Sequence, residues 1–88
     1  MTVQQQSVTE ALEQIVRRFA PKTKGELRLT PATRLIEEAG IDSPRMIDIV
    51  LDVEDRFGFT IEDHEAQQVR TFGDLVTLVN LRSAREAD

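Results

Sequence analysis

The sequence predicts an all-α domain, a small four-helix bundle with a long loop between the first and second helices. Three segments carry apolar residues at helical spacing, within residues 7–21, 44–57 and 71–81, and a short fourth helix fits residues 59–69. Amphipathic helices of this length are marginal alone in water, so they must pack their apolar faces against one another. The chain has 88 residues, of which 40% are hydrophobic, enough for one thin core.

The first helix begins at a capping box. Ser7 and Glu10 fit the S-x-x-E pattern, in which each side chain accepts a hydrogen bond from the backbone of the other residue. Pro21 closes the segment, and Arg17 and Arg18 suit the negative end of the helix dipole. The apolar face consists of Val8, Leu12, Ile15, Val16 and Phe19.

Residues 20–33 form a long connection. They contain turn-forming residues and two aliphatic ones, Leu27 and Leu29, whose alternation would suit a short strand. No second strand pattern exists to pair with it, so we expect a loop that the leucines pin to the core. Residues 33–40 could add a helical turn that ends at Gly40.

The helix over residues 44–57 has an apolar face toward the core, and Gly58 suits its C-terminal end. That face consists of Met46, Val50, Val53 and Phe57, with Ile49 at its edge.

The opposite face of this helix is acidic and carries Asp48, Asp52 and Asp55. An ordinary solvated surface is one interpretation of these acids. However, Leu51 falls among them, Ile47 lies on the flank, and Pro44 stands above Leu51 on the same side. Apolar groups inside a charge stripe favour a docking surface, on which acids attract a basic partner and apolar side chains add contact.

The last helix begins near Thr71 and Asp74, which resemble a capping box with Asp in place of Glu. Gly73 in its first turn lowers its intrinsic helicity. Its broad apolar face consists of Phe72, Leu75, Val76, Leu78 and Val79. We therefore divide the chain into a flexible N-terminal tail over residues 1–6, a folded domain over 7–81 and a polar tail over 82–88.

Composition excludes several classes of function. The net charge of −5 argues against nucleic-acid binding, and no apolar run approaches the length of a membrane span. The chain has no cysteine and one histidine, His64, so neither disulfides nor a transition-metal site is expected. The N-terminus lacks the pattern of a signal peptide, which predicts a cytoplasmic protein.

Ser43 stands where a helix cap belongs, because Pro44 follows it and proline is favoured at the first helical position. If Ser43 is the cap, Ser43→Ala costs roughly 1 kcal/mol. A catalytic nucleophile would need a nearby base and an orienting group, and the sequence shows neither, so no enzymatic activity is expected. A third possibility is attachment of a phosphate ester, since the helix dipole and free amides stabilise an anion there.

The stretch "GIDSPRMIDIVLDVEDRFGFTIED", followed by "TFGDLVTLV", resembles the acyl carrier protein family. The matching parts are Gly40-x-Asp42-Ser43, the helix end "EDRFG", the turn from Ile61 to Asp63 and the helix start "TFGDL". The resemblance covers nearly the whole domain. It implies a four-helix bundle of acyl-carrier type that holds acyl intermediates as thioesters and presents them to enzymes of fatty-acid, lipid or secondary-metabolite synthesis.

The resemblance assigns roles residue by residue. Ser43 matches the serine that carries 4′-phosphopantetheine, covalently attached from coenzyme A, and Asp42 matches the acid before it. Residues implied to dock partner enzymes are Pro44, Arg45, Ile47, Asp48, Leu51, Asp52, Glu54 and Asp55. Residues implied to line the acyl pocket are Val50, Val53, Phe57, Ile61, Ala66 and Val69. The implied partners are a phosphopantetheinyl transferase and acyl-transferring or synthase enzymes with basic docking patches, acting on a monomeric carrier.

The sequence departs from the family pattern beside the serine. Pro44 replaces a usual leucine, Arg45 replaces a usual acid, and Glu62 replaces a common proline. The first two positions face partner enzymes in the family, so we expect a specialised carrier with dedicated partners. Two alternatives stay open: an unmodified interaction module of carrier fold, in which Ser43 is only a cap, and an aminoacyl or peptidyl carrier.

Overall fold

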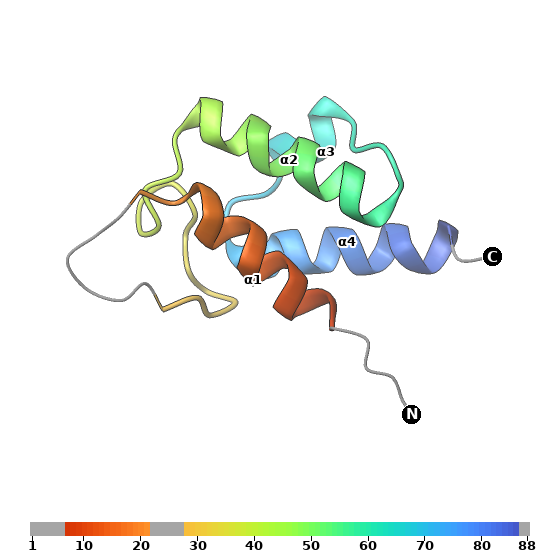
Figure 1. The fold of residues 1–88 in the computed structure, drawn as a ribbon, viewed down its shortest axis with the longest axis horizontal. Coiled ribbons are helices and arrows are strands. Elements are labelled where there is room, and N and C mark those ends of the chain that lie inside the picture. Colours follow the sequence, from red (N-terminus) through yellow and green to blue (C-terminus); the bar gives the residue numbers. More distant parts are fainter. Residues whose placement is uncertain (1–6, 22–27, 87–88) are drawn as a thin grey trace.

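The computed structural model describes residues 7–21 and 28–86, and within them it is built from four helices. They are α1 (Val8–Phe19), α2 (Ser43–Phe57), α3 (Asp63–Gln67) and α4 (Phe72–Glu86), in the order along the chain that Figure 1 shows. No strand occurs in these ranges, apart from one isolated bridge between Arg34 and Thr71. The prediction of an all-α bundle with a long first connection is confirmed.

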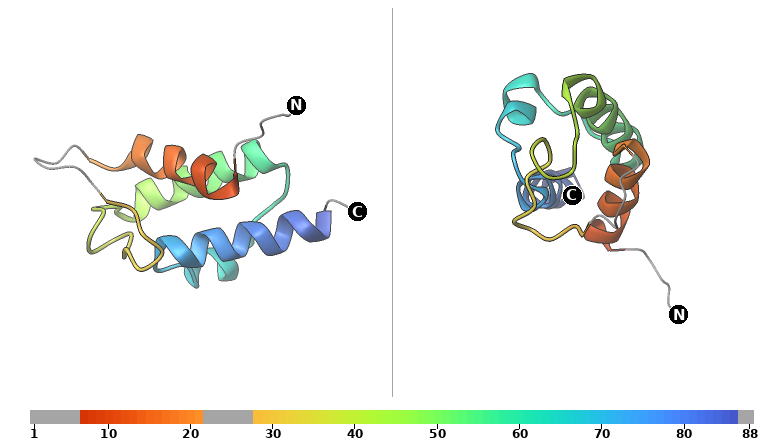
Figure 2. Two further views of the ribbon diagram at one scale, coloured as in Figure 1. Left: turned by 90° about the horizontal axis from the view of Figure 1, so that it is seen from below. Right: turned by 90° about the vertical axis from the view of Figure 1, so that its left-hand side faces the viewer.

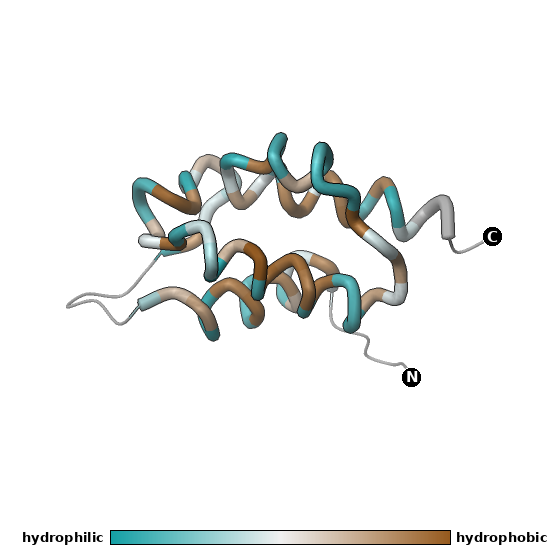
Figure 3. Tube along the Cα trace, turned by 90° about the horizontal axis from the view of Figure 1, so that it is seen from above, coloured by the Kyte–Doolittle hydropathy of each residue, from teal (hydrophilic) through white to brown (hydrophobic). Residues whose placement is uncertain are grey.

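The four helices surround one apolar core. The end-on view in Figure 2 shows α1 and α2 on one side of the bundle and α3 and α4 on the other. In Figure 3 the hydrophobic residues of the helices gather on their facing sides. Fully buried side chains come from α1, α2, α4 and the first connection, and include Leu12, Ile15, Val16, Leu35, Ile41, Ile49, Val53, Phe72, Leu75 and Val79.

Local capping signals place the starts of α1 and α4 as predicted. Ser7 Oγ accepts a hydrogen bond from the Glu10 amide at 3.0 Å, and Glu10 Oε1 accepts one from the Ser7 amide at 3.4 Å. Before α4, Thr71 Oγ1 accepts from the Asp74 amide at 3.0 Å, and Asp74 Oδ2 accepts from the amides of Arg70 and Thr71. These two amides hold the pKa of Asp74 below its usual range.

The first connection is fixed by the backbone of the segment that leads into α4. The Leu35 amide donates to the Arg70 carbonyl at 2.9 Å, and the Phe72 amide donates to the Thr33 carbonyl at 2.8 Å. The partner for the expected loop is therefore the α3–α4 connection, which has no strand pattern of its own. Leu29 is half-buried, whereas Leu27 lies outside the described residues.

Two helix assignments from the sequence are corrected. In α2, Ile49 is fully buried together with Val53, whereas the pattern placed Ile49 at the edge of the core face. The core lies against that side of α2 because α1 packs there. At the C-terminus, α4 continues past Leu81 to Glu86, through residues that the pattern assigned to a polar tail.

Gly73 permits close contact between α4 and the first connection. Its amide donates to the Pro31 carbonyl at 2.9 Å, and a Cβ at this position would lie 2.8 Å from that same oxygen. The glycine is therefore required by packing, which outweighs its lower helix propensity.

We predict that Gly73→Ala destabilises the domain by about 1–3 kcal/mol, because the added methyl group pushes Pro31 away from α4. Helix propensity alone would predict a gain of about 1 kcal/mol. Urea unfolding followed by circular dichroism measures the difference. Asn80→Ala, at an exposed position of the same helix, is the matched control and should change stability by less than about 0.5 kcal/mol. A stabilised Gly73→Ala variant would contradict the packing argument.

Candidate functional site

The first turn of α2 is organised by Asp42. Asp42 is the N-cap, with Oδ1 accepting from the Arg45 amide at 3.0 Å, and Ser43 is the first helical residue. The Arg45 guanidinium donates to Asp42 Oδ2 at 2.8 Å. The prediction that Ser43 is the cap is wrong, because the acid one residue earlier reaches the same turn and gains an ion pair.

This capping leaves few amides at the start of α2. The Arg45 amide donates to the Asp42 side chain, the Met46 amide donates to the Asp42 carbonyl at 2.8 Å, and Pro44 has no N–H. The sequence predicted that free amides at this helix start would hold a phosphate. Of these amides, only that of Ser43 itself remains. What the site does offer is access, since Ser43 is exposed and its hydroxyl has no hydrogen-bond partner within the described ranges.

An apolar cleft of about 510 Å³ opens beside Ser43, between α2 and α3. Of the residues predicted to line an acyl pocket, Val50, Ile61, Ala66 and Val69 line this cleft. The same lining includes Ser43, so the serine hydroxyl and the cleft belong to one site. The group expected to be attached there, a flexible arm with a carbon chain at its end, fits an exposed hydroxyl at the rim of an apolar cleft.

Two residues predicted for the pocket lie outside this lining. Val53 is fully buried in the core, and the ring of Phe57 lies against that of Phe59, with 6.4 Å between their centroids. Met46, assigned to the core from its spacing, is half-buried against the core and also lines the cleft. The spacing alone did not show which of the two neighbouring stripes on α2 faces α1 and which faces α3.

Exposed aliphatic side chains gather around the cleft. Ile47 and Leu51 are 61% and 56% exposed and both line the cleft, so these two aliphatic side chains are accessible at the surface. Ile36, 58% exposed, joins them from the first connection. Ile36 was not among the residues predicted for this surface, and the one sequence signal for it is an aliphatic side chain followed by two glutamates in a predicted turn. A patch of this kind next to an exposed hydroxyl favours contact with another protein.

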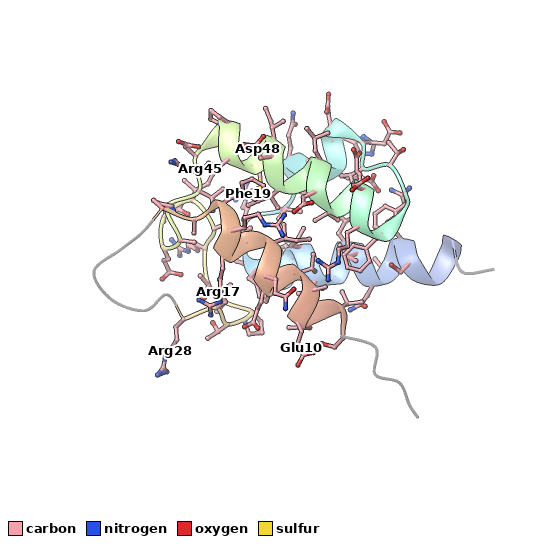
Figure 4. All side chains as sticks on the ribbon, in the orientation of Figure 1. Glu10, Arg17, Phe19, Arg28, Arg45 and Asp48 are labelled. Carbon is pink, nitrogen blue, oxygen red and sulfur yellow. The ribbon has the colours of Figure 1, made fainter. Side chains whose placement is uncertain are left out.

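The predicted docking acids differ in whether their carboxylates already have a partner within the described part of the protein. Asp48 and Asp55 are exposed and take part in no ion pair within residues 7–21 and 28–86. Asp52 pairs with Arg18 of α1 at 3.0 Å. Glu54 Oε2 accepts from the Ile61 amide at 2.7 Å, so its carboxylate supports the connection to α3. Figure 4 shows Arg45 and Asp48 on the first half of α2.

The described residues contain no group of three or more metal-ligating side chains. None of the helices in the described part of the chain has the length and apolarity needed to cross a bilayer. Pro44 is exposed on the same turn as Ser43. In the described residues, the site combines an exposed hydroxyl, an apolar cleft and a patch of exposed aliphatic side chains.

A small four-helix domain with an exposed serine hydroxyl at an apolar cleft has the features of a carrier domain. The family model described as "Phosphopantetheine attachment site" matches residues 10–79. The chain belongs to this family, the acyl carrier proteins, whose members bear a covalently attached phosphopantetheine and carry acyl groups between enzymes.

Named relatives agree with this assignment. The acyl carrier protein of Tropheryma whipplei is 32% identical over 79 residues, which cover 90% of this chain and 94% of the relative. The meromycolate extension acyl carrier protein of Mycobacterium leprae is 29% identical, over 90% of this chain and 67% of its own. A solved structure from Mycobacterium tuberculosis, described as a candidate acyl carrier protein, superposes with a TM-score of 0.75 at 27% identity, covering 85% of this chain and 97% of the other.

The position of the cap gives a stability prediction. Asp42→Ala should destabilise the domain by roughly 1 kcal/mol or more, because it removes both the cap and the ion pair with Arg45. Ser43→Ala should cost less than about 0.5 kcal/mol, because the Ser43 side chain bonds to nothing in the described structure. Urea unfolding of both variants beside the parent measures this order. The reverse order would restore Ser43 as the cap.

Proposed function

We propose that Ser43 is the residue to which phosphopantetheine is attached. The observation that carries the proposal is the joint position of its exposed hydroxyl at the start of α2 and at the rim of the apolar cleft. In the modification, Ser43 Oγ forms a bond to phosphorus and the pyrophosphate bond of coenzyme A breaks. Adenosine 3′,5′-bisphosphate leaves, and the hydroxyl proton passes to a base of the transferase. The attached arm supplies a thiol, which holds the cargo as a thioester.

The cleft between α2 and α3 is the proposed shelter for the cargo. Its lining is mostly aliphatic and thioether side chains, including Met46, Val50 and Ala66, with Glu54, Asp63 and Gln67 among them. Such a lining favours an alkyl chain over a charged or strongly polar group, because burial of apolar surface is favourable and burial of an unpaired polar group is costly. Acyl cargo is therefore preferred to aminoacyl cargo.

The surface around Ser43 is the proposed docking face for the enzymes that load and use the cargo. Ile36, Ile47 and Leu51 supply apolar contact, and the exposed Asp48 and Asp55 attract basic patches. In this proposal the chain is a monomeric carrier of the cytoplasm and catalyses nothing itself, because its partners supply the acids and bases. The pair between Asp42 and Arg45 makes the rim beside Ser43 less acidic, which favours dedicated partners.

Attachment is tested by intact-mass analysis after incubation with coenzyme A and a broad-specificity phosphopantetheinyl transferase. The parent should gain one phosphopantetheine and Ser43→Ala none. The alanine variant must remain folded, which circular dichroism checks. No gain on the parent with several transferases, including those of its own organism, would support the alternative of an unmodified interaction module on this fold.

A second prediction concerns the charge beside the serine. Arg45→Ala should raise the rate constant of modification by a transferase with a basic docking patch about two- to fivefold at low salt, because it frees one oxygen of Asp42 and makes the rim more acidic. The gain should shrink at high salt. Arg28→Ala removes the same charge from the first connection, away from α2 (Figure 4), and should leave the rate unchanged. An equal gain in both variants would show that only net charge matters.

A further inference from the structure

The wall of the cleft formed by α3 cannot hold its position by itself. α3 has five residues, Asp63–Gln67, and none of them is fully buried. A helix of this length is not stable in isolation, because too few backbone hydrogen bonds offset the cost of starting it. Its position beside α2 therefore depends on contacts from the neighbouring elements.

Two side-chain contacts hold this segment, one from α2 and one from α4. Glu54 of α2 accepts the Ile61 amide at 2.7 Å, just before α3 begins. Arg82 of α4 donates to Glu65 of α3, with 2.8 Å between Nη1 and Oε1. The two side chains of the second contact are only 17% and 23% exposed, so water screens this pair less than a surface pair.

Arg82 also contacts the segment that precedes α3. The guanidinium carbon lies 5.1 Å from the centroid of the Phe59 ring, within the range of a cation–π contact, and Phe59 is buried. Glu65 Oε1 additionally accepts the Glu62 amide at 2.9 Å. That amide, with Arg82 beside it, holds the pKa of Glu65 below its usual value, so the carboxylate is charged at neutral pH.

Glu65, which accepts the hydrogen bond from Arg82, is not among the residues that line the cleft. Glu65 faces a shallow groove that it shares with Leu78 and Leu81 of α4. Ala66, the next residue, lines the cleft with α2. Because Glu65 and Ala66 are adjacent residues of one short helix, a contact that holds Glu65 against α4 also restricts where Ala66 lies beside the cleft.

We propose that Arg82 is a positioning residue for the cargo: by holding α3 and Phe59 against α4, it sets how wide the cleft opens and so which acyl chains it shelters. The part of this inference that concerns cargo rests on the function proposed above. The contacts of Arg82 with Glu65 and Phe59, which we call the tether, are a property of the unmodified chain, so they are tested without any cargo.

The first measurement is amide hydrogen exchange of the unmodified protein. Arg82→Met keeps the apolar stem over Phe59 and removes the charge, and Glu65→Gln keeps an acceptor for the Glu62 amide. Both should accelerate exchange of the amides of Ala66, Gln68 and Val69 about three- to tenfold, and the double variant should be no faster than either single one. Arg28→Met, the matched loss of charge, should change nothing there. Unchanged exchange in both single variants would overturn the tether.

The second measurement uses protein loaded from butanoyl, octanoyl and dodecanoyl coenzyme A, with loading verified by intact mass. Cleavage of the thioester by hydroxylamine reports how well the chain is sheltered. In the parent, hydroxylamine should cleave the thioester of the longest chain faster than that of a shorter, better-sheltered chain. In both variants, the chain that is cleaved most slowly should be longer than in the parent. If exchange accelerates and the protection profile stays the same, the assignment of cargo selection to Arg82 is wrong. If the parent takes up no arm at all, the proposed function fails and cargo selection fails with it, while hydrogen exchange still decides the tether.

Discussion

The packing of α1 between α2 and α4 is the constraint on which the other elements depend. Leu12, Ile15 and Val16 are fully buried, and α1 is the helix that contacts both long neighbours. The chain has no cysteine and so no disulfide, and burial of the apolar core that includes this stripe drives folding. Because α1 occupies one side of α2 completely, the apolar residues on the next side of α2 are left without a helix of comparable size to cover them.

That incomplete cover explains why a site exists at all. The half-buried stripe of α2 faces the short α3, and the space between them remains as a cleft with Ser43 at its rim. A longer third helix would close the space and stabilise the domain at the expense of room for a guest. The marginal core of a small domain is thus divided between a part that fixes the fold and a part that remains adaptable.

The sequence predicted the starts of α1 and α4, because each start depends on a pattern of three or four residues, Ser7–Glu10 and Thr71–Asp74. The sequence did not predict the cap and the core face of α2, because the local pattern allows two arrangements there and tertiary contacts determine which one forms. Asp42 and Ser43 are both good caps, and in the structure Asp42 caps the helix and also pairs with the side chain of Arg45. Helical spacing placed Ile49 only at the edge of the core face, although it is fully buried, because the direction of the core depends on α1. The exposure of Ile36 and the need for Gly73 follow from the path of the first connection, which no local pattern records.

The backbone bridge between the first connection and the segment before α4 has a consequence for how the domain folds. Its hydrogen bonds, from Leu35 to Arg70 and from Phe72 to Thr33, join segments that are separated by both α2 and α3. Closing so long a loop costs entropy that local helix contacts do not, so we expect this bridge to form after α1 and α2 have packed. The side of the molecule that carries Ile36 and the end of α3 would then be the last to become ordered during folding and the first to open during local fluctuations.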